Sequence, residues 1–107
     1  MNRGDLAIAA LPGSYGKPRP VLVIQSDLFR HLYSVTVLPL SSELVDAPAF
    51  RITIEPTPDN GLQLRSQVLV DKAHTLPIHK LGRTIGQLAA NDMATVNQAL
   101  SAFLGFE

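Results

Sequence analysis

The 107 residues include nine basic and nine acidic side chains and no cysteine, and 46% are hydrophobic while 17% are charged. This length and composition indicate one globular domain and exclude the disordered class. No apolar run reaches the ~20 residues of a membrane helix, and the lack of cysteine excludes disulfides and thiolate metal sites. The first residues show no charged segment followed by an apolar one, so we expect no secretory signal and a cytoplasmic address.

The first half of the chain predicts short apolar strands separated by turns. Leu6–Ala10 is an apolar run that stops at residues 11–16, where turn-forming residues predict a mobile loop. Val21–Gln25 follows as an apolar strand that we expect to be buried on both faces. Ser34–Leu40 predicts a further strand, which ends at two serines.

The second half predicts two more strands. Residues 50–55 alternate strictly between apolar and polar, which places Phe50, Ile52 and Ile54 on a core face. A turn over residues 56–61 follows, because its Asn-Gly pair tolerates positive φ angles. Residues 67–75 predict one strand that begins apolar and becomes polar.

A change of period near Ala90 predicts an amphipathic helix. Its apolar stripe is expected to pack on the core, and Gly105 stands where a C-terminal cap belongs. Short strands and many turns before one helix predict a mainly β fold, a small, strongly bent antiparallel barrel with the helix packed on it. The stripe consists of Met93, Val96, Leu100 and Phe103.

Basic residues concentrate in two segments of a neutral chain. Residues 1–20 carry three basic side chains against one acidic, and residues 61–83 carry four against one. If the segments meet in space, they form a positive face that attracts phosphate at short range. If they do not meet, the charges form an even, solvated surface.

The sequence gives little support for a metal site or for a glycine-rich nucleotide-binding loop. The three histidines are scattered, and the glycines at 13 and 16 precede Lys17-Pro18, which cannot open a phosphate-binding helix. A hydrolytic triad of Ser41, His74 and Asp71 can be assembled, but it lacks a nucleophile-elbow signature.

The remaining polar residues suit phosphodiester cleavage without a metal. Pro20 favours an extended backbone at Arg19, which holds a guanidinium at a strand entrance. Cleaving RNA through its own 2′-hydroxyl needs a base, a proton donor and groups that stabilise charge on phosphorus. Structural roles compete: a solvated arginine that blocks edge pairing, a serine turn and a salt-bridged aspartate. The set comprises Arg19, Ser41, Ser42, Asp71, Lys72, His74 and Thr75.

The order of short motifs along the chain is specific, although each motif is weak alone. Arg3-Gly4-Asp5-Leu6 is followed by Arg19-Pro20 with its apolar strand and by Val37 to Ser42. The second half continues through Ser66 to Asp71, His74-Thr75-Leu76, Ile85-Gly86-Gln87-Leu88 and the terminal helix. In this order the motifs resemble the MazF/PemK family of toxin-antitoxin endoribonucleases. The resemblance spans nearly the whole chain, as a single domain over residues 1–107.

The resemblance implies an SH3-like barrel of the MazF/CcdB type that forms a homodimer and cuts single-stranded mRNA without metal or cofactor. Such enzymes leave a cyclic phosphate and a 5′-hydroxyl, and an acidic antitoxin silences them. By position, the catalytic residues are Arg19 and Ser41, with Asp71 near the scissile group. Leu69 stands where some members place an arginine. The residues expected to bind RNA are Lys17, Ser42, Lys72, His74 and Thr75.

Two alternatives share the expected fold. A gyrase inhibitor of the CcdB type depends on a C-terminal Trp-Gly-Ile, whereas this chain ends in Gly-Phe-Glu and has no tryptophan. A non-catalytic barrel that binds RNA or an antitoxin agrees with Leu69 and with the short loop over residues 13–18.

Overall fold

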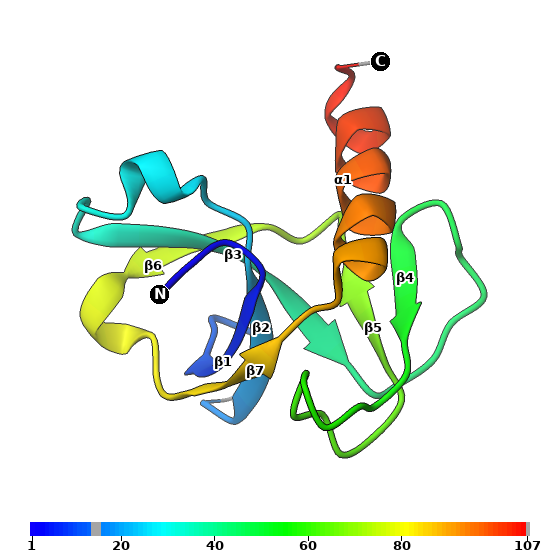
Figure 1. Ribbon diagram of the computed structural model, residues 1–107, viewed down its shortest axis with the longest axis horizontal. Coiled ribbons are helices and arrows are strands. Elements are labelled where there is room, and N and C mark those ends of the chain that lie inside the picture. The colour runs from blue at the N-terminus through cyan, green and yellow to red at the C-terminus, as the bar shows by residue number, and fades with distance from the viewer. Residues whose placement is uncertain (14–15, 107) are drawn as a thin grey trace.

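A curled antiparallel sheet with one helix packed against it forms the part of the chain that the computed structural model describes, residues 1–13 and 16–106 (Figure 1). The predicted mainly β fold with a C-terminal helix is confirmed. Residues 14 and 15 of the predicted mobile loop lie outside the described residues. The elements are β1 (Asp5–Ala10), β2 (Pro18–Val23), η1 (Asp27–Phe29), β3 (Ser34–Ser41), β4 (Arg51–Ile54), β5 (Ser66–Leu69), β6 (His74–Pro77), η2 (Ile78–Lys80), β7 (Thr84–Gln87) and α1 (Ala90–Leu104).

The sheet follows the strand order β4-β5-β3-β2-β1-β7, and β6 pairs with the first half of β3. The end of β3 pairs instead with β5, so this one strand joins the two parts of the sheet. The resulting half-barrel brings β7 beside β1, although nearly eighty residues separate them in sequence.

Both faces of the central strands are buried, as predicted for the strand that begins at Val21. Leu22 lies in the cluster that packs under α1, whereas Val21 and Val23 lie in a second cluster on the opposite face of the sheet. β1 and β3 divide their side chains in the same way. Because successive side chains of a strand point to opposite faces, continuous apolar runs serve two clusters at once.

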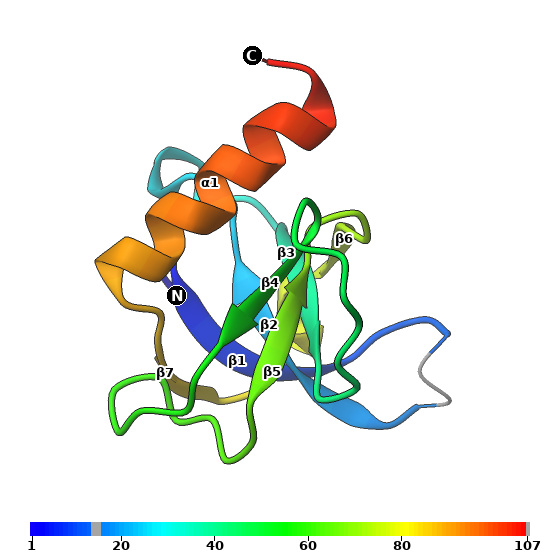
Figure 2. The ribbon, with the colours of Figure 1, turned by 90° about the vertical axis from the view of Figure 1, so that its right-hand side faces the viewer.

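The terminal helix is confirmed over Ala90–Leu104, and Gly105 ends it with a φ of 83°. Val96 and Leu100 are buried against the sheet, and Met93 packs on the same cluster. The prediction that Phe103 belongs to the buried stripe is wrong, because its side chain is 53% exposed. Figure 2 gives the reason: the last turns of α1 project beyond the strands.

Two strand predictions need correction. Phe50 is not a core residue: it is 38% exposed and lies in the turn before β4, where its N–H donates to the Ala47 carbonyl. Residues 67–75 do not form one strand either. The Lys72 N–H donates to the Leu69 carbonyl, and this turn separates β5 from β6, which pair with different parts of β3. The change from apolar to polar residues marked this turn.

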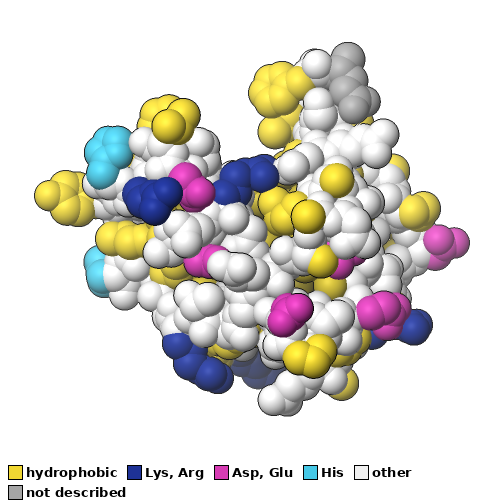
Figure 3. Space-filling view, viewed as in Figure 1, with side chains coloured by type: hydrophobic (Ala, Val, Ile, Leu, Met, Phe, Trp, Pro, Cys, Tyr) yellow, Lys and Arg dark blue, Asp and Glu magenta, His cyan; other side chains and the backbone are white. Residues whose placement is uncertain are grey.

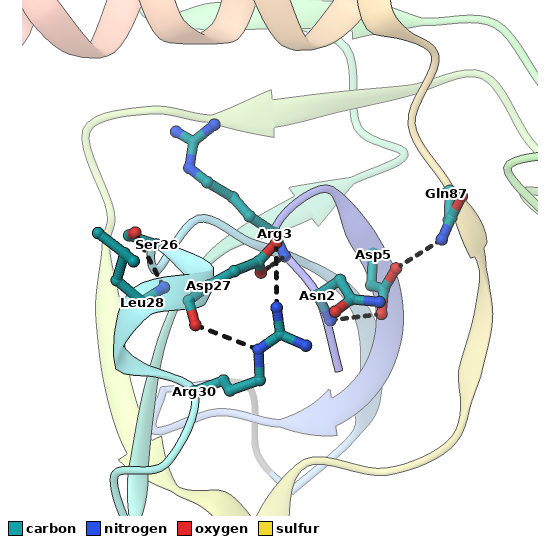
Figure 4. A network of polar contacts seen from close by, with 8 residues as sticks. All are labelled: Asn2, Arg3, Asp5, Ser26, Asp27, Leu28, Arg30 and Gln87. Atoms are coloured by element: carbon teal, nitrogen blue, oxygen red, sulfur yellow. Dashed lines mark hydrogen bonds and ion pairs between the residues drawn. The ribbon is translucent and has the colours of Figure 1, made fainter.

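Arg3 and Asp5 connect β1 with η1, β7 and α1, and Figure 4 shows the hydrogen bonds to Asp27 of η1 and Gln87 of β7. Asp5 is 5% exposed, and its carboxylate accepts hydrogen bonds from the Asn2 N–H at 2.8 Å and from the Gln87 amide at 3.1 Å. Arg3 donates from Nε to the Ile24 carbonyl at 2.8 Å and from Nη2 to Asn97 of α1 at 2.7 Å. Both side chains therefore have structural contacts.

Replacing Asp5 by alanine is expected to lower the free energy of unfolding by about 1–3 kcal/mol, because two part-buried hydrogen bonds to a charged acceptor are lost. Urea unfolding followed by circular dichroism measures this change. Arg30→Ala is the control: its contact with Asp27 spans 3.7 Å between exposed groups, so its loss costs about 0.5 kcal/mol or less. Equal losses in the two variants would contradict the role given to Asp5.

Candidate functional site

Arg19 lies on β2 and Ser41 at the end of β3, and both line one hollow. The two strands pair up to Val21 and Pro39. Beyond that point, Ser41 pairs with β5 instead. Arg19 is exposed, and the ion pairs among the described residues all join other side chains. Its guanidinium therefore presents its N–H donors to solvent.

A hollow of about 550 Å³ opens beside this pair, and we call it the Ser41 hollow. It extends from Arg19 over the end of β3 toward the segment that joins β5 to β6. Arg19 and Lys72 make this hollow attractive to anions. The lining also contains one carboxylate, that of Glu43. The lining residues are Leu11, Pro12, Gly13, Arg19, Pro39, Leu40, Ser41, Ser42, Glu43, Leu69, Lys72 and His74.

Local hydrogen bonds orient the Ser41 hydroxyl. Its Oγ accepts the Glu43 N–H at 3.1 Å, which leaves the O–H proton free to donate elsewhere. The segment after Ser41 is held by Gln67, which is 6% exposed and pairs with Ser41 across the strands. Gln67 accepts from the Val45 N–H at 3.0 Å and from Arg51 Nε at 2.8 Å. The serine is thus placed by a buried polar network.

The structure brings together five of the residues that the sequence singled out. Arg19, Ser41, Ser42, Lys72 and His74 all line the Ser41 hollow. The two hydroxyls and the two cations among them can bind the oxygens of a phosphodiester.

The other three predicted residues lie outside this lining. Asp71 is in the turn after β5, where its carboxylate accepts from Lys72 Nζ at 3.0 Å, so the salt bridge considered above is present. Thr75 lines a neighbouring hollow, and its Oγ1 is 2.7 Å from that of Thr36. Lys17 is exposed on the chain before β2 and lines none of these hollows.

A second hollow of about 610 Å³, the Arg83 hollow, adjoins the first and shares Arg19, Leu40 and Ser42 with it. Arg83 reaches it because the Ile8 N–H of β1 donates to the Arg83 carbonyl while β2 pairs on the other side of β1. The two basic segments therefore do meet, at Arg19 and Arg83. Its other lining residues were not predicted: Ile8, Pro18, Pro20, Leu40, Gly61, Leu62, Gln63, Leu64, Ser66, Thr84 and Ile85.

Within residues 1–13 and 16–106, no three histidine, aspartate or glutamate side chains group closely enough to hold a metal ion. Over the same ranges, α1 is too short and too polar to cross a membrane.

The whole chain is similar to known endoribonucleases. Residues 2–104 match the family model described as "PemK-like, MazF-like toxin of type II toxin-antitoxin system". A probable endoribonuclease MazF of Mycolicibacterium smegmatis is 49% identical over 106 residues, which are 98% of this chain and 97% of that protein. Endoribonuclease MazF3 of Mycobacterium tuberculosis is 35% identical over 78% of this chain and 80% of its own length.

Solved structures agree with these sequence matches. The Mycobacterium tuberculosis toxin MazF-mt6 superposes with a TM-score of 0.81 at 30% identity, over 94% of this chain and 96% of its own. MazF from Deinococcus radiodurans shares the fold, with a TM-score of 0.82 at 20% identity over 98% and 96% of the two chains. The expected barrel of the MazF type is thereby confirmed. The chain belongs to the family of PemK-like and MazF-like toxins of type II toxin-antitoxin systems.

Proposed function

We propose that this endoribonuclease toxin cleaves single-stranded mRNA in the cytoplasm through the 2′-hydroxyl of the substrate, without a metal ion. The observation that carries the proposal is that Arg19 of β2 and Ser41 of β3 line one hollow. A phosphodiester placed between them receives donors from two strands. The Ser41 hydroxyl is already oriented by the Glu43 N–H before substrate arrives, and donors positioned in advance stabilise a transition state most strongly.

In the reaction, the 2′-oxygen loses its proton to a base and bonds to phosphorus. The bond from phosphorus to the 5′-oxygen breaks, and that oxygen takes a proton. The products are a 2′,3′-cyclic phosphate and a 5′-hydroxyl. Arg19 stabilises the negative charge that accumulates on the phosphoryl oxygens, and Ser41 donates its O–H to one of them. Asp71 orients the reacting group together with Lys72, which lines the hollow.

The experiment is cleavage of one labelled RNA, single-stranded or annealed to its complement, in buffer that contains EDTA. We expect cuts in the single strand only, with a 5′-hydroxyl that polynucleotide kinase labels without prior phosphatase. A requirement for added Mg²⁺, or a 3′-hydroxyl on the upstream fragment, contradicts the proposed chemistry.

We further propose that the toxin is a homodimer. Its support is a set of large apolar side chains that remain exposed on η1 and at the end of α1. Figure 3 shows hydrophobic side chains on both of these projections, on either side of the recess at the top of the view. Light scattering of the purified chain tests this: a mass twice that of one chain is expected, and the mass of a single chain contradicts it. The residues are Leu28, Phe29, Leu32, Tyr33, Phe103, Leu104 and Phe106.

We propose an acidic antitoxin as the inhibitor, because an acidic segment complements the cations at the Ser41 and Arg83 hollows and competes with RNA for them. One structural neighbour, 24% identical, is described as an endoribonuclease in complex with its cognate antitoxin from a mycobacterial species. In this chain Arg19, Lys72 and Arg83 are the cations available at the two hollows.

A further inference from the structure

The Arg83 hollow has no role in the proposed cleavage chemistry, yet it adjoins the reacting groups. It shares Arg19, Leu40 and Ser42 with the Ser41 hollow and extends from them toward β1 and β7. A phosphodiester bound at Arg19 therefore lies where the two hollows join, within reach of the Arg83 hollow for a neighbouring nucleotide. At about 610 Å³, the second hollow falls within the size range of ligand pockets and accommodates a base with its ribose.

The lining of this hollow suits a nucleobase. Gln63 offers an amide that both donates and accepts, and Arg83 offers several N–H donors in one plane. Both side chains are exposed, and neither belongs to an ion pair of the described residues. Leu64 is 64% exposed beside them and provides an apolar surface for the face of a ring. Single-stranded RNA is recognised in this way, through base edges and ring faces.

The wall that carries Gln63 is rigid before any ligand binds. Asn60 is 2% exposed, its Oδ1 accepts from the N–H groups of Thr57 and Leu62 at 3.0 Å each, and its amide donates to the Glu55 carbonyl at 2.9 Å. Gly61 lies directly against the backbone of Ile85. A pre-formed wall reduces the ordering cost of binding, so the hydrogen bonds of Gln63 contribute to selection of the base.

We propose that the Arg83 hollow binds the base of the nucleotide next to the scissile phosphate, and that Gln63 and Arg83 determine which base is accepted there. The inference rests on the proposed function and deepens it, because it assigns one position of the cleaved motif to named side chains. Selection follows from pairing: an unsuitable base leaves the amide or the guanidinium without a partner in a partly desolvated site.

The test uses a pool of single-stranded RNAs randomised around one cut site, with the 5′ ends of all products sequenced. Gln63→Ala and Arg83→Ala are expected to lower the preference at one position beside the cut by about three- to tenfold and to keep the preferences elsewhere. Gln63→Glu keeps the size of the side chain but removes its donors, so the preferred base at that position should change.

Two matched controls separate selection from general effects. Arg65→Ala removes a cation from the same loop, but this arginine is paired with Glu55 and does not line the hollow. Gln98→Ala removes an exposed amide from α1. Both controls should keep the wild-type motif.

The outcomes separate the inference from the proposed function. Wild-type motifs in both Gln63→Ala and Arg83→Ala overturn the inference, and so does an equal loss of preference at every position. A wild-type protein that cuts no RNA overturns the proposed function instead.

Discussion

Replacement of Arg19 by alanine is expected to lower kcat/KM for single-stranded RNA by about a hundred- to a thousandfold, as for the loss of one fixed donor to a charged transition state. Arg19 lines both hollows and carries a planar set of N–H donors beside Ser41 in the hollow that the two residues share. The change should appear mainly in kcat, since the charge on the phosphoryl oxygens increases only as the reaction proceeds. Initial rates with a fluorogenic RNA in EDTA measure it.

The Arg19→Lys variant separates charge from geometry. Lysine keeps the positive charge but loses the planar fork, so it should recover RNA binding better than it recovers kcat. Arg30→Ala on η1 serves as the control and should cleave at the wild-type rate, because this arginine lines neither hollow. Cleavage by Arg19→Ala within about twofold of wild type would remove Arg19 from the proposed mechanism.

Replacement of Gly61 by alanine is expected to destabilise the fold by about 3 kcal/mol or more, the upper end for an overpacked site. A Cβ atom at Gly61 would lie 2.1 Å from the Ile85 carbonyl oxygen, and the φ angle of 71° adds strain to any other residue. Backbone atoms cannot rotate away as a flexible side chain does. Urea unfolding measures the loss as a change in the free energy of unfolding.

Gly105→Ala is the matched control for this prediction. Gly105 has a φ of 83°, but a Cβ atom there has no neighbour within 4 Å. The control therefore reports the backbone strain alone, about 1 kcal/mol. If the two variants lose the same free energy, the contact between the turn at Gly61 and β7 does not limit stability.

The strands and the helix could be predicted because their apolar patterns have local causes. Val21–Val23 is apolar throughout because both of its faces are buried, and the helix at Ala90 shows a clear change of period. Phe50 and Phe103 were misplaced for a common reason. Each phenylalanine fits the spacing of its neighbours but lies one step outside the buried part of its element. Phe50 is still in the turn before β4, and Phe103 lies where α1 has passed the sheet. The point at which a buried pattern ends is set by tertiary contacts, and the spacing of apolar residues in the sequence gives no information about these contacts.

The candidate site was predicted in part. Arg19 and Ser41 could be proposed from the Arg-Pro motif and the serines at a strand end, and the structure places both on the lining of one hollow. Gln63 and Arg83 carried no comparable signal. They approach Arg19 only because β7 pairs with β1, and a pairing between strands so far apart in sequence leaves no local mark.

The loop between β4 and β5 contains two kinds of residue: those whose substitution destabilises the fold, and those that can be substituted without this cost. Asn60 bonds the loop to itself and Gly61 packs it against β7, so most substitutions there cost stability before they alter activity. Gln63 and Leu64 project from the same loop into solvent and support no other part of the fold. New side chains at these two positions can therefore be sampled at little cost in stability. A toxin of this construction can acquire a different cleavage motif through exposed residues while its barrel stays intact.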